Sequence, residues 1–94
     1  MALRKFVIER EVPKIGTLAG GEMRGAAGKS NEALSKLKGD VQWVHSYVAD
    51  DKTFCIYLAV DEGAIRKHSE LSGFPANRIT EVHRLIDPTT ERTG

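Results

Sequence analysis

The stretch "VQWVHSYVADDKTFCIYLAV", residues 41–60, decides the fold because it contains two strands and the turn between them. The segments 41–49 and 53–60 are rich in β-branched and aromatic residues, which favour extended strands. The polar residues 50–52 between them are typical of a short turn. We therefore predict an antiparallel hairpin in the middle of the chain.

The sequence on either side of this hairpin completes a six-element order. The pattern predicts further elements at four places: a strand at 3–12, a helix at 17–37, a helix at 62–72 and a strand at 78–86. Asp61 is placed to cap the second helix and Gly73 to end it. The order β-α-β-β-α-β is typical of the ferredoxin-like α+β fold, a four-stranded antiparallel sheet with two helices on one face. We expect this domain to span 1–86 and a polar tail to span 87–94.

The tripeptide Gly28-Lys29-Ser30 resembles the end of a phosphate-binding loop. Such a loop needs another glycine five positions before Gly28, and Met23 stands there. The helical spacing of apolar residues also continues through the tripeptide. We therefore interpret it as part of a helix and expect no nucleotide binding.

Size and composition restrict the class of protein. The chain has 94 residues, enough for one small domain that pairing with a second copy would help to stabilise. Its formal net charge of +1 gives no reason to expect nucleic acid or an anionic membrane as a partner. The lone Cys55 excludes an internal disulfide framework, and there is neither a signal-peptide pattern nor an apolar run long enough to span a membrane. We expect a cytoplasmic protein.

Alternation along the strands predicts which residues share a face of the sheet. With a loop at 50–52, Tyr47 would pair with Cys55 and His45 with Tyr57. The helix-facing side would then carry mainly apolar residues: Phe6, Ile8, Val44, Val48, Phe54, Ile56, Leu58, Val82 and Ile86. The uncovered side would carry Val7, Glu9, Trp43, His45, Tyr47, Cys55, Tyr57, Glu81 and His83. A face this aromatic predicts an interface, and two such sheets back to back would form a dimeric α+β barrel.

The polar groups of that face are the candidates for a site. The metal-ligand candidates are the imidazole and thiol residues: His45, Cys55, His83 and, on the second helix, His68. A lone histidine on an apolar helix face is more often a packed, hydrogen-bonded residue than a ligand, and His68 has that position. The candidates for binding a small ligand are Tyr47, Tyr57 and Glu81.

Three functions stay open at this point. The first is a homodimer that binds a divalent metal ion, nickel or zinc, or a small ligand on the sheet face. The second is a dimeric-barrel enzyme in which His45, Tyr47, Tyr57 or His83 does acid–base chemistry on a small organic substrate. The third is a structural module without a site, in which the polar groups only satisfy hydrogen bonds at the interface.

The segments "VQWVHSYVADDKTFCIYLA" and "AIRKHSELSGFPANRITEV" resemble a family of small bacterial ferredoxin-like proteins of unknown function, some of them described as nickel-binding. The resemblance runs from "FVIEREV" to "EVHRLIDP" and implies the same fold and a homodimer. It makes Cys55, His68 and the segment around Glu81 candidates for the site. The nickel-binding members carry histidines in the first strand and after the glycine that ends the second helix, where this chain reads "VIEREV" and "GFPA".

Overall fold

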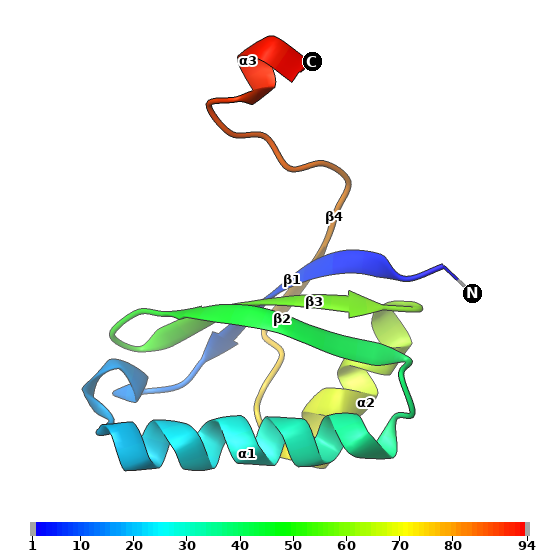
Figure 1. Cartoon of the computed structure of the whole chain (residues 1–94). Coiled ribbons are helices and arrows are strands. Elements are labelled where there is room, and N and C mark those ends of the chain that lie inside the picture. The colour runs from blue at the N-terminus through cyan, green and yellow to red at the C-terminus, as the bar shows by residue number, and fades with distance from the viewer. Residues whose placement is uncertain (1, 94) are drawn as a thin grey trace.

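A computed structural model describes residues 2–93 and has the ferredoxin-like order of elements (Figure 1). The strands are β1 (Arg4–Glu11), β2 (Val41–Val48), β3 (Lys52–Ala59) and β4 (Arg78–Val82). The helices are α1 (Gly20–Lys36), α2 (Glu62–Ser72) and α3 (Thr90–Thr93), with a 3-10 turn, η1 (Ile15–Thr17), before α1. The predicted fold class is confirmed.

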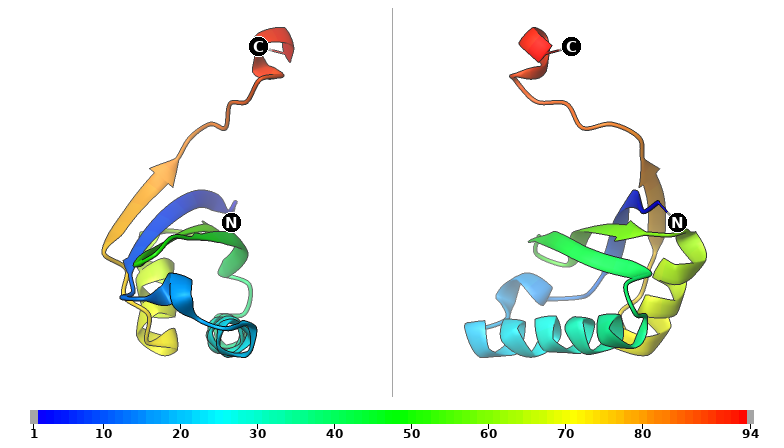
Figure 2. Two further views of the ribbon diagram at one scale, coloured as in Figure 1. Left: turned by 90° about the vertical axis from the view of Figure 1, so that its left-hand side faces the viewer. Right: turned by 45° about the vertical axis from the view of Figure 1, so that its right-hand side comes forward.

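The sheet is fully antiparallel in the order β2-β3-β1-β4. Both long helices lie on one side of it, and no helix within residues 2–93 covers the other side (Figures 1 and 2). After β4 the chain leaves the body on that other side and ends in α3 (Figures 1 and 2). The sheet therefore has a helix-facing side and an uncovered side.

Helix α1 contains the tripeptide that resembled a phosphate-binding loop. The helix runs unbroken through Gly28, Lys29 and Ser30, and Ser30 is buried against the sheet side of the molecule. A phosphate-binding loop would leave the backbone N–H groups of these residues free, whereas here they lie inside the helix. The interpretation as a packed helix is confirmed.

The ends of α2 follow directly from two residues. The Asp61 side chain accepts a hydrogen bond from the backbone N–H of Ala64 at 2.8 Å, so it caps the first turn. Gly73 adopts a left-handed conformation with φ of 81°, which glycine tolerates best, and ends the helix. Both predictions for this helix are confirmed, and its buried residues include Ile65 and His68.

The turn η1 closes one side of the space between α1 and the sheet. The backbone N–H of Gly16 donates to the carbonyl of Asp50 at 3.0 Å, which ties η1 to the turn between β2 and β3. A Cβ atom at Gly16 would lie 2.6 Å from the carbonyl oxygen of Ala49. Only glycine allows this close approach.

The predicted assignment of the two sheet faces is wrong for β3. Cys55 and Tyr57 are only 6% and 2% exposed and belong to the core under the helices. Phe54, Ile56 and Leu58 alternate with them and therefore lie on the uncovered side. Both sets of side chains are apolar enough for a core, so the alternation alone did not distinguish them. Phe6 and Ile8 do lie on the helix-facing side, as predicted.

A β-bulge at Val44 corrects the prediction for β2. Trp43 pairs with Tyr57, but the next pair is His45 with Ile56, so Val44 is the extra residue. The bulge places Trp43 on the helix-facing side and keeps His45 and Tyr47 on the uncovered side, as the registers of their partners require. Val44 and Val48, predicted to be core residues, are each 48% exposed, although Val48 pairs with Thr53 and does lie on the helix-facing side as predicted.

The last strand is shorter than predicted. It ends at Val82, and the predicted core residue Ile86 lies beyond it and is 73% exposed. Val82 pairs with Lys5 and so lies on the uncovered side, whereas Glu81 pairs with Phe6 and lies on the helix-facing side. The assignments of Val82, Ile86 and Glu81 to sheet faces are therefore wrong.

Candidate functional site

A chain of buried polar side chains connects the sheet to both helices. Arg10 on β1 approaches His68 on α2, with 3.5 Å between Nη2 and Nδ1. His68 Nε2 lies 3.2 Å from the Ser30 hydroxyl of α1, and that hydroxyl lies 3.3 Å from the Tyr57 hydroxyl of β3. Arg10, Ser30, Tyr57 and His68 are all buried, His68 completely. This network is the largest departure from an apolar core in the described part of the molecule.

The donors of the network fix the protonation state of His68. A guanidinium only donates, so Nδ1 of His68 must accept and the proton must sit on Nε2. Burial, and after it the positive charge of Arg10, lowers the pKa of His68 below its ordinary 6.5, against the opposing effect of a hydrogen bond with the Ser30 backbone. The imidazole is therefore neutral at pH 7 and donates from Nε2 to Ser30.

Tyr57 also stays protonated. Burial raises the pKa of its phenol above the ordinary 10.0, although the hydrogen bond with Ser30 and the charge of Arg10 act in the opposite direction. The guanidinium carbon of Arg10 lies 5.7 Å from the centroid of the Tyr57 ring, within the range of a cation–π contact. The network thus consists of three neutral groups and one cation.

Arg10 also holds the loop after α2. Its Nη1 donates to the Ser69 hydroxyl at 3.0 Å and to the carbonyl oxygens of Phe74 and Pro75 at 3.3 and 2.8 Å. Two of these acceptors are carbonyls just beyond the negative end of the α2 dipole, where a cation is stabilised. The guanidinium is thus fixed in position.

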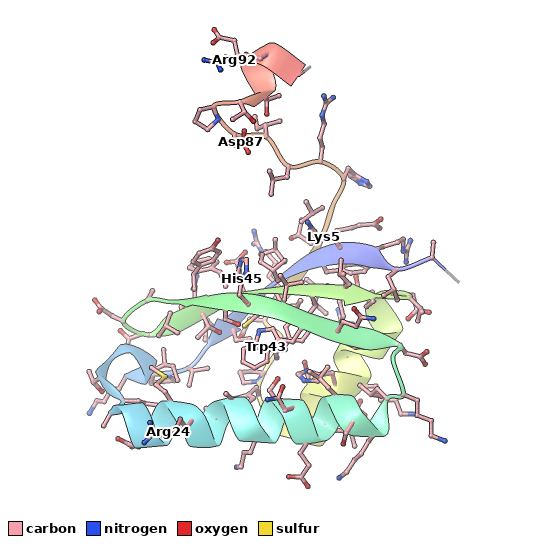
Figure 3. The ribbon with its side chains drawn as sticks, in the orientation of Figure 1. Lys5, Arg24, Trp43, His45, Asp87 and Arg92 are labelled. Atoms are coloured by element: carbon pink, nitrogen blue, oxygen red, sulfur yellow. The ribbon has the colours of Figure 1, made fainter. Side chains whose placement is uncertain are left out.

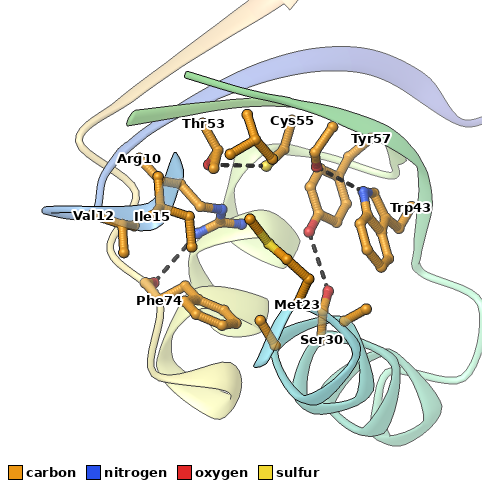
Figure 4. A pocket seen from close by; sticks show the side chains of 14 residues that line it. Arg10, Val12, Ile15, Met23, Ser30, Trp43, Thr53, Cys55, Tyr57 and Phe74 are labelled. Carbon is orange, nitrogen blue, oxygen red and sulfur yellow. Dashed lines mark hydrogen bonds between the residues drawn. The ribbon is translucent and has the colours of Figure 1, made fainter. Parts of the chain in front are cut away.

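A cavity of about 120 Å³ lies beside Arg10, between α1 and the sheet (Figure 4). Met23, Ala26 and Ala27 of α1 form one wall, and Trp43 and Tyr57 form the other. Figure 4 shows the Arg10 guanidinium and the Tyr57 hydroxyl reaching toward this space from the sheet, with Ser30 and Met23 below them. The cavity is a mostly apolar space with a fixed cation in its wall.

The uncovered side of the sheet has a different chemistry. Ile56 and Leu58 of β3 and Val7 of β1 lie next to one another through the strand register, and all are partly buried. His45 and Tyr47 stand at the β2 edge of this surface, with their rings in edge-to-face contact at 5.1 Å between centroids. Figure 3 shows His45 on the side of the sheet away from the helices and Trp43 on the helix side.

The structure separates the predicted metal ligands. His45 and Cys55 lie on opposite sides of the sheet, so the site that they were predicted to share with His83 is not formed within one chain. His68 lies in the buried network, and His83 is exposed beyond β4. Within residues 2–93 no group of three histidine, cysteine or acidic residues has the geometry of a metal site.

The predicted ligand-binding residues are separated as well. Tyr57 lines the cavity, whereas Tyr47 is 61% exposed on the other side of the sheet. Glu81, on the edge strand β4, forms an ion pair at 3.4 Å with Arg4 on the neighbouring strand β1. Tyr57 is therefore the one ligand-binding candidate that the structure brings into the cavity.

Sequence reasoning missed Arg10 and Ser30. Arg10 continues the alternation of the buried Phe6 and Ile8, so a charged residue at a core position of β1 was a readable signal. Ser30 has helical spacing from Met23 and Ala26, but nothing local distinguishes a buried serine from an exposed one. Its partners come from other elements.

Fold and site together define a ferredoxin-like α+β protein with a polar network and a small cavity between its helices and its sheet. A family model described as "Nickel responsive protein SCO4226-like" matches residues 6–82, and the chain belongs to this family. A crystal structure of SCO4226 from Streptomyces coelicolor A3(2) is similar, with a TM-score of 0.70 and 16% sequence identity over 87% of this chain and 99% of that one. Comparison with curated proteins gives no match.

Membership of this family confirms the resemblance that the sequence suggested. The family name connects its members with nickel, and the shared structure extends over nearly the whole of both chains. Among the described residues, no helix has the length and apolarity that crossing a bilayer would need.

Proposed function

We propose that this protein acts as a homodimer that binds a divalent metal ion, nickel first among them, between the uncovered faces of its two sheets. The family description supports a connection with nickel. The observation that carries the proposal is the position of His45, exposed on the uncovered side beside an apolar surface. An exposed imidazole at the border of such a surface is available both to a partner chain and to a metal.

A single chain does not bring together enough ligands for a metal ion, but two chains could complete the set at their interface. Two-fold pairing brings each residue of the interface in twice, so one histidine per chain supplies two imidazoles. Neutral imidazole is a suitable ligand for nickel. His83 follows β4 directly and is also exposed, which makes it the second residue that we assign to this site.

Calorimetric titration of the untagged protein with nickel chloride tests this function. We expect saturable binding that weakens by at least about tenfold in His45→Ala, which corresponds to about 1.4 kcal/mol.

Cys55→Ser is the matched control, since this thiol is buried on the other side of the sheet. It should leave the nickel affinity unchanged. Equal binding by His45→Ala and the wild type, or loss of binding in Cys55→Ser, would refute a site on the uncovered face.

A further inference from the structure

Arg10 is a buried cation, and no acidic residue is buried with it in the described part of the chain. It is 3% exposed, and its hydrogen-bond partners among the described residues are all neutral: Ser69, His68 and the carbonyls of Phe74 and Pro75. Burying a charge without a counter-charge is costly, and buried charges in proteins are usually paired. The carbonyls beyond α2 offset part of that cost, but they leave the net charge of the region at +1.

The hydrogen bonds of the guanidinium go to neutral groups. It carries five N–H groups, of which Nη1 serves Ser69 and the two carbonyls, and Nη2 serves His68. Tyr57 is a further neutral partner, since a hydrogen bond with Arg10 is among the effects that act on its phenol. A guanidinium can bind a carboxylate with two parallel hydrogen bonds, so an anion in the cavity would supply the counter-charge that Arg10 lacks.

The cavity beside Arg10 sets the size of what can bind there. Its volume of about 120 Å³ is comparable with the roughly 150 Å³ that accommodates a benzene molecule in an apolar protein cavity. Its walls are mainly apolar, with Met23 and Ala26 on α1 opposite the Trp43 ring. Tyr57 adds a neutral hydroxyl, which can donate to an anion when Ser30 donates to it in turn.

We propose that this cavity is a binding site for a small organic anion, a monocarboxylate with a compact apolar body about the size of a benzene ring. The carboxylate pairs with Arg10 and accepts from the Tyr57 hydroxyl. The apolar body lies between α1 and the sheet, against Trp43 and Met23. This site is on the opposite side of the sheet from the proposed metal site and does not depend on it.

Benzoate is the probe that tests the proposal, with its neutral isostere benzamide and the small anion acetate as comparison ligands. Trp43 is the sole tryptophan of the chain and lines the cavity, so its fluorescence reports binding there. We expect benzoate to change this fluorescence saturably and to raise the melting temperature. Benzamide and acetate should each bind at least about tenfold more weakly, because one lacks the charge and the other the apolar body.

Two variants remove the two halves of the site. Arg10→Met removes the charge and should reduce benzoate affinity to that of benzamide. Because Arg10 also holds the loop after α2, this variant is paired with Ala26→Leu, which fills the cavity and leaves Arg10 in place. Ala26→Leu should abolish benzoate binding while the protein still melts cooperatively.

Ser35→Leu is the control, since it introduces the same side chain at an exposed position of the same helix. It should bind benzoate as the wild type does. The proposal is overturned if the wild type gives no saturable response up to about 10 mM benzoate, a limit weaker than ordinary ligand affinities. Equal affinity for benzamide, or unchanged binding by Ala26→Leu, overturns it too.

Discussion

His68 is the residue whose chemical state depends most on its neighbours. Its ring is fully buried and lies between Arg10 on one side and Ser30 on the other. The charged Arg10 and the protonated Tyr57, whose ring centroid is 5.1 Å away, are the ionisable groups that face it. A second positive charge here would meet that of Arg10 in a region with few water molecules to screen it.

Stability should therefore depend on pH through His68. Its pKa in the folded state is lowered from 6.5, so below that pH the unfolded chain binds the proton more readily. The free energy of unfolding should be at its full value above pH 6.5 and fall as the pH drops from there toward 5, by up to about 1.4 kcal/mol per pH unit. Denaturant unfolding of the wild type and His68→Gln across this range measures the effect.

His68→Gln cannot take up the proton, so its free energy of unfolding should change less between pH 5 and 6.5 than that of the wild type. A slope that persists in His68→Gln would assign the pH dependence to other groups.

At the scale of elements, α1 is a helix held in place by packing rather than by intrinsic propensity. It contains four glycines, at positions 20, 21, 25 and 28, each of which disfavours the helix by about 1 kcal/mol relative to alanine. Its buried contacts include Ser30 and Ala33. The helix wall of the cavity therefore depends on tertiary contacts.

Replacing two of these glycines should stabilise the protein. Gly25 and Gly28 are exposed, and a Cβ atom at either would meet nothing within 4 Å. We expect Gly25→Ala and Gly28→Ala each to raise the free energy of unfolding by about 0.5–1 kcal/mol. Gly16→Ala should instead destabilise, because its Cβ would lie 2.6 Å from the Ala49 carbonyl oxygen. Chemical denaturation of the three variants measures whether each raises or lowers the free energy of unfolding. A destabilising Gly28→Ala would contradict the open space around that position.

At the scale of the whole molecule, the uncovered side of the sheet is the main apolar surface among the described residues without a layer over it. Val7, Ile56 and Leu58 are only partly buried there. Beyond β4, Leu85 and Ile86 are 68% and 73% exposed on a segment that extends from the body on the same side (Figures 1 and 2). Contiguous apolar surface of this kind favours association.

A charge in this surface should separate the subunits of the proposed dimer. Ile56 lies in the middle of the sheet face, between Val7 on β1 and His45 on β2. Ile56→Glu should give a monomer by light scattering and, under the proposed function, lose nickel affinity as well. Leu71→Glu is the control, because Leu71 is 43% exposed on α2. A wild-type monomer at tens of micromolar, about the range of ordinary interface affinities, would reject the dimer.

The sequence by itself determined the order of elements, the antiparallel hairpin and the limits of α2. These features depend on local chemistry. Asp61 caps the helix through an atom three residues away, Gly73 adopts the left-handed conformation that ends it, and the 41–60 hairpin joins neighbours in the chain. The helical state of Gly28-Lys29-Ser30 was also readable, because the spacing of apolar residues continues through it.

Only the tertiary structure decided which side of the hairpin faces the helices. In β3 the set Phe54, Ile56 and Leu58 is as suitable for a core as the set Cys55 and Tyr57, so alternation gave no preference. The Tyr57 hydroxyl can be buried because Ser30 of another element satisfies it, and such a partner is not visible from β3 alone.

The bulge at Val44 and the buried position of Arg10 were also decided only by the tertiary structure. The bulge changes which side chains of β2 face inward, so Trp43 joins the cavity while His45 stays outside. Arg10 is tolerated in the core because Ser69 and the carbonyls after α2, more than 50 residues away in sequence, accept its hydrogen bonds. Contacts between distant segments determined the site, whereas local signals in the sequence were enough to predict the order of elements.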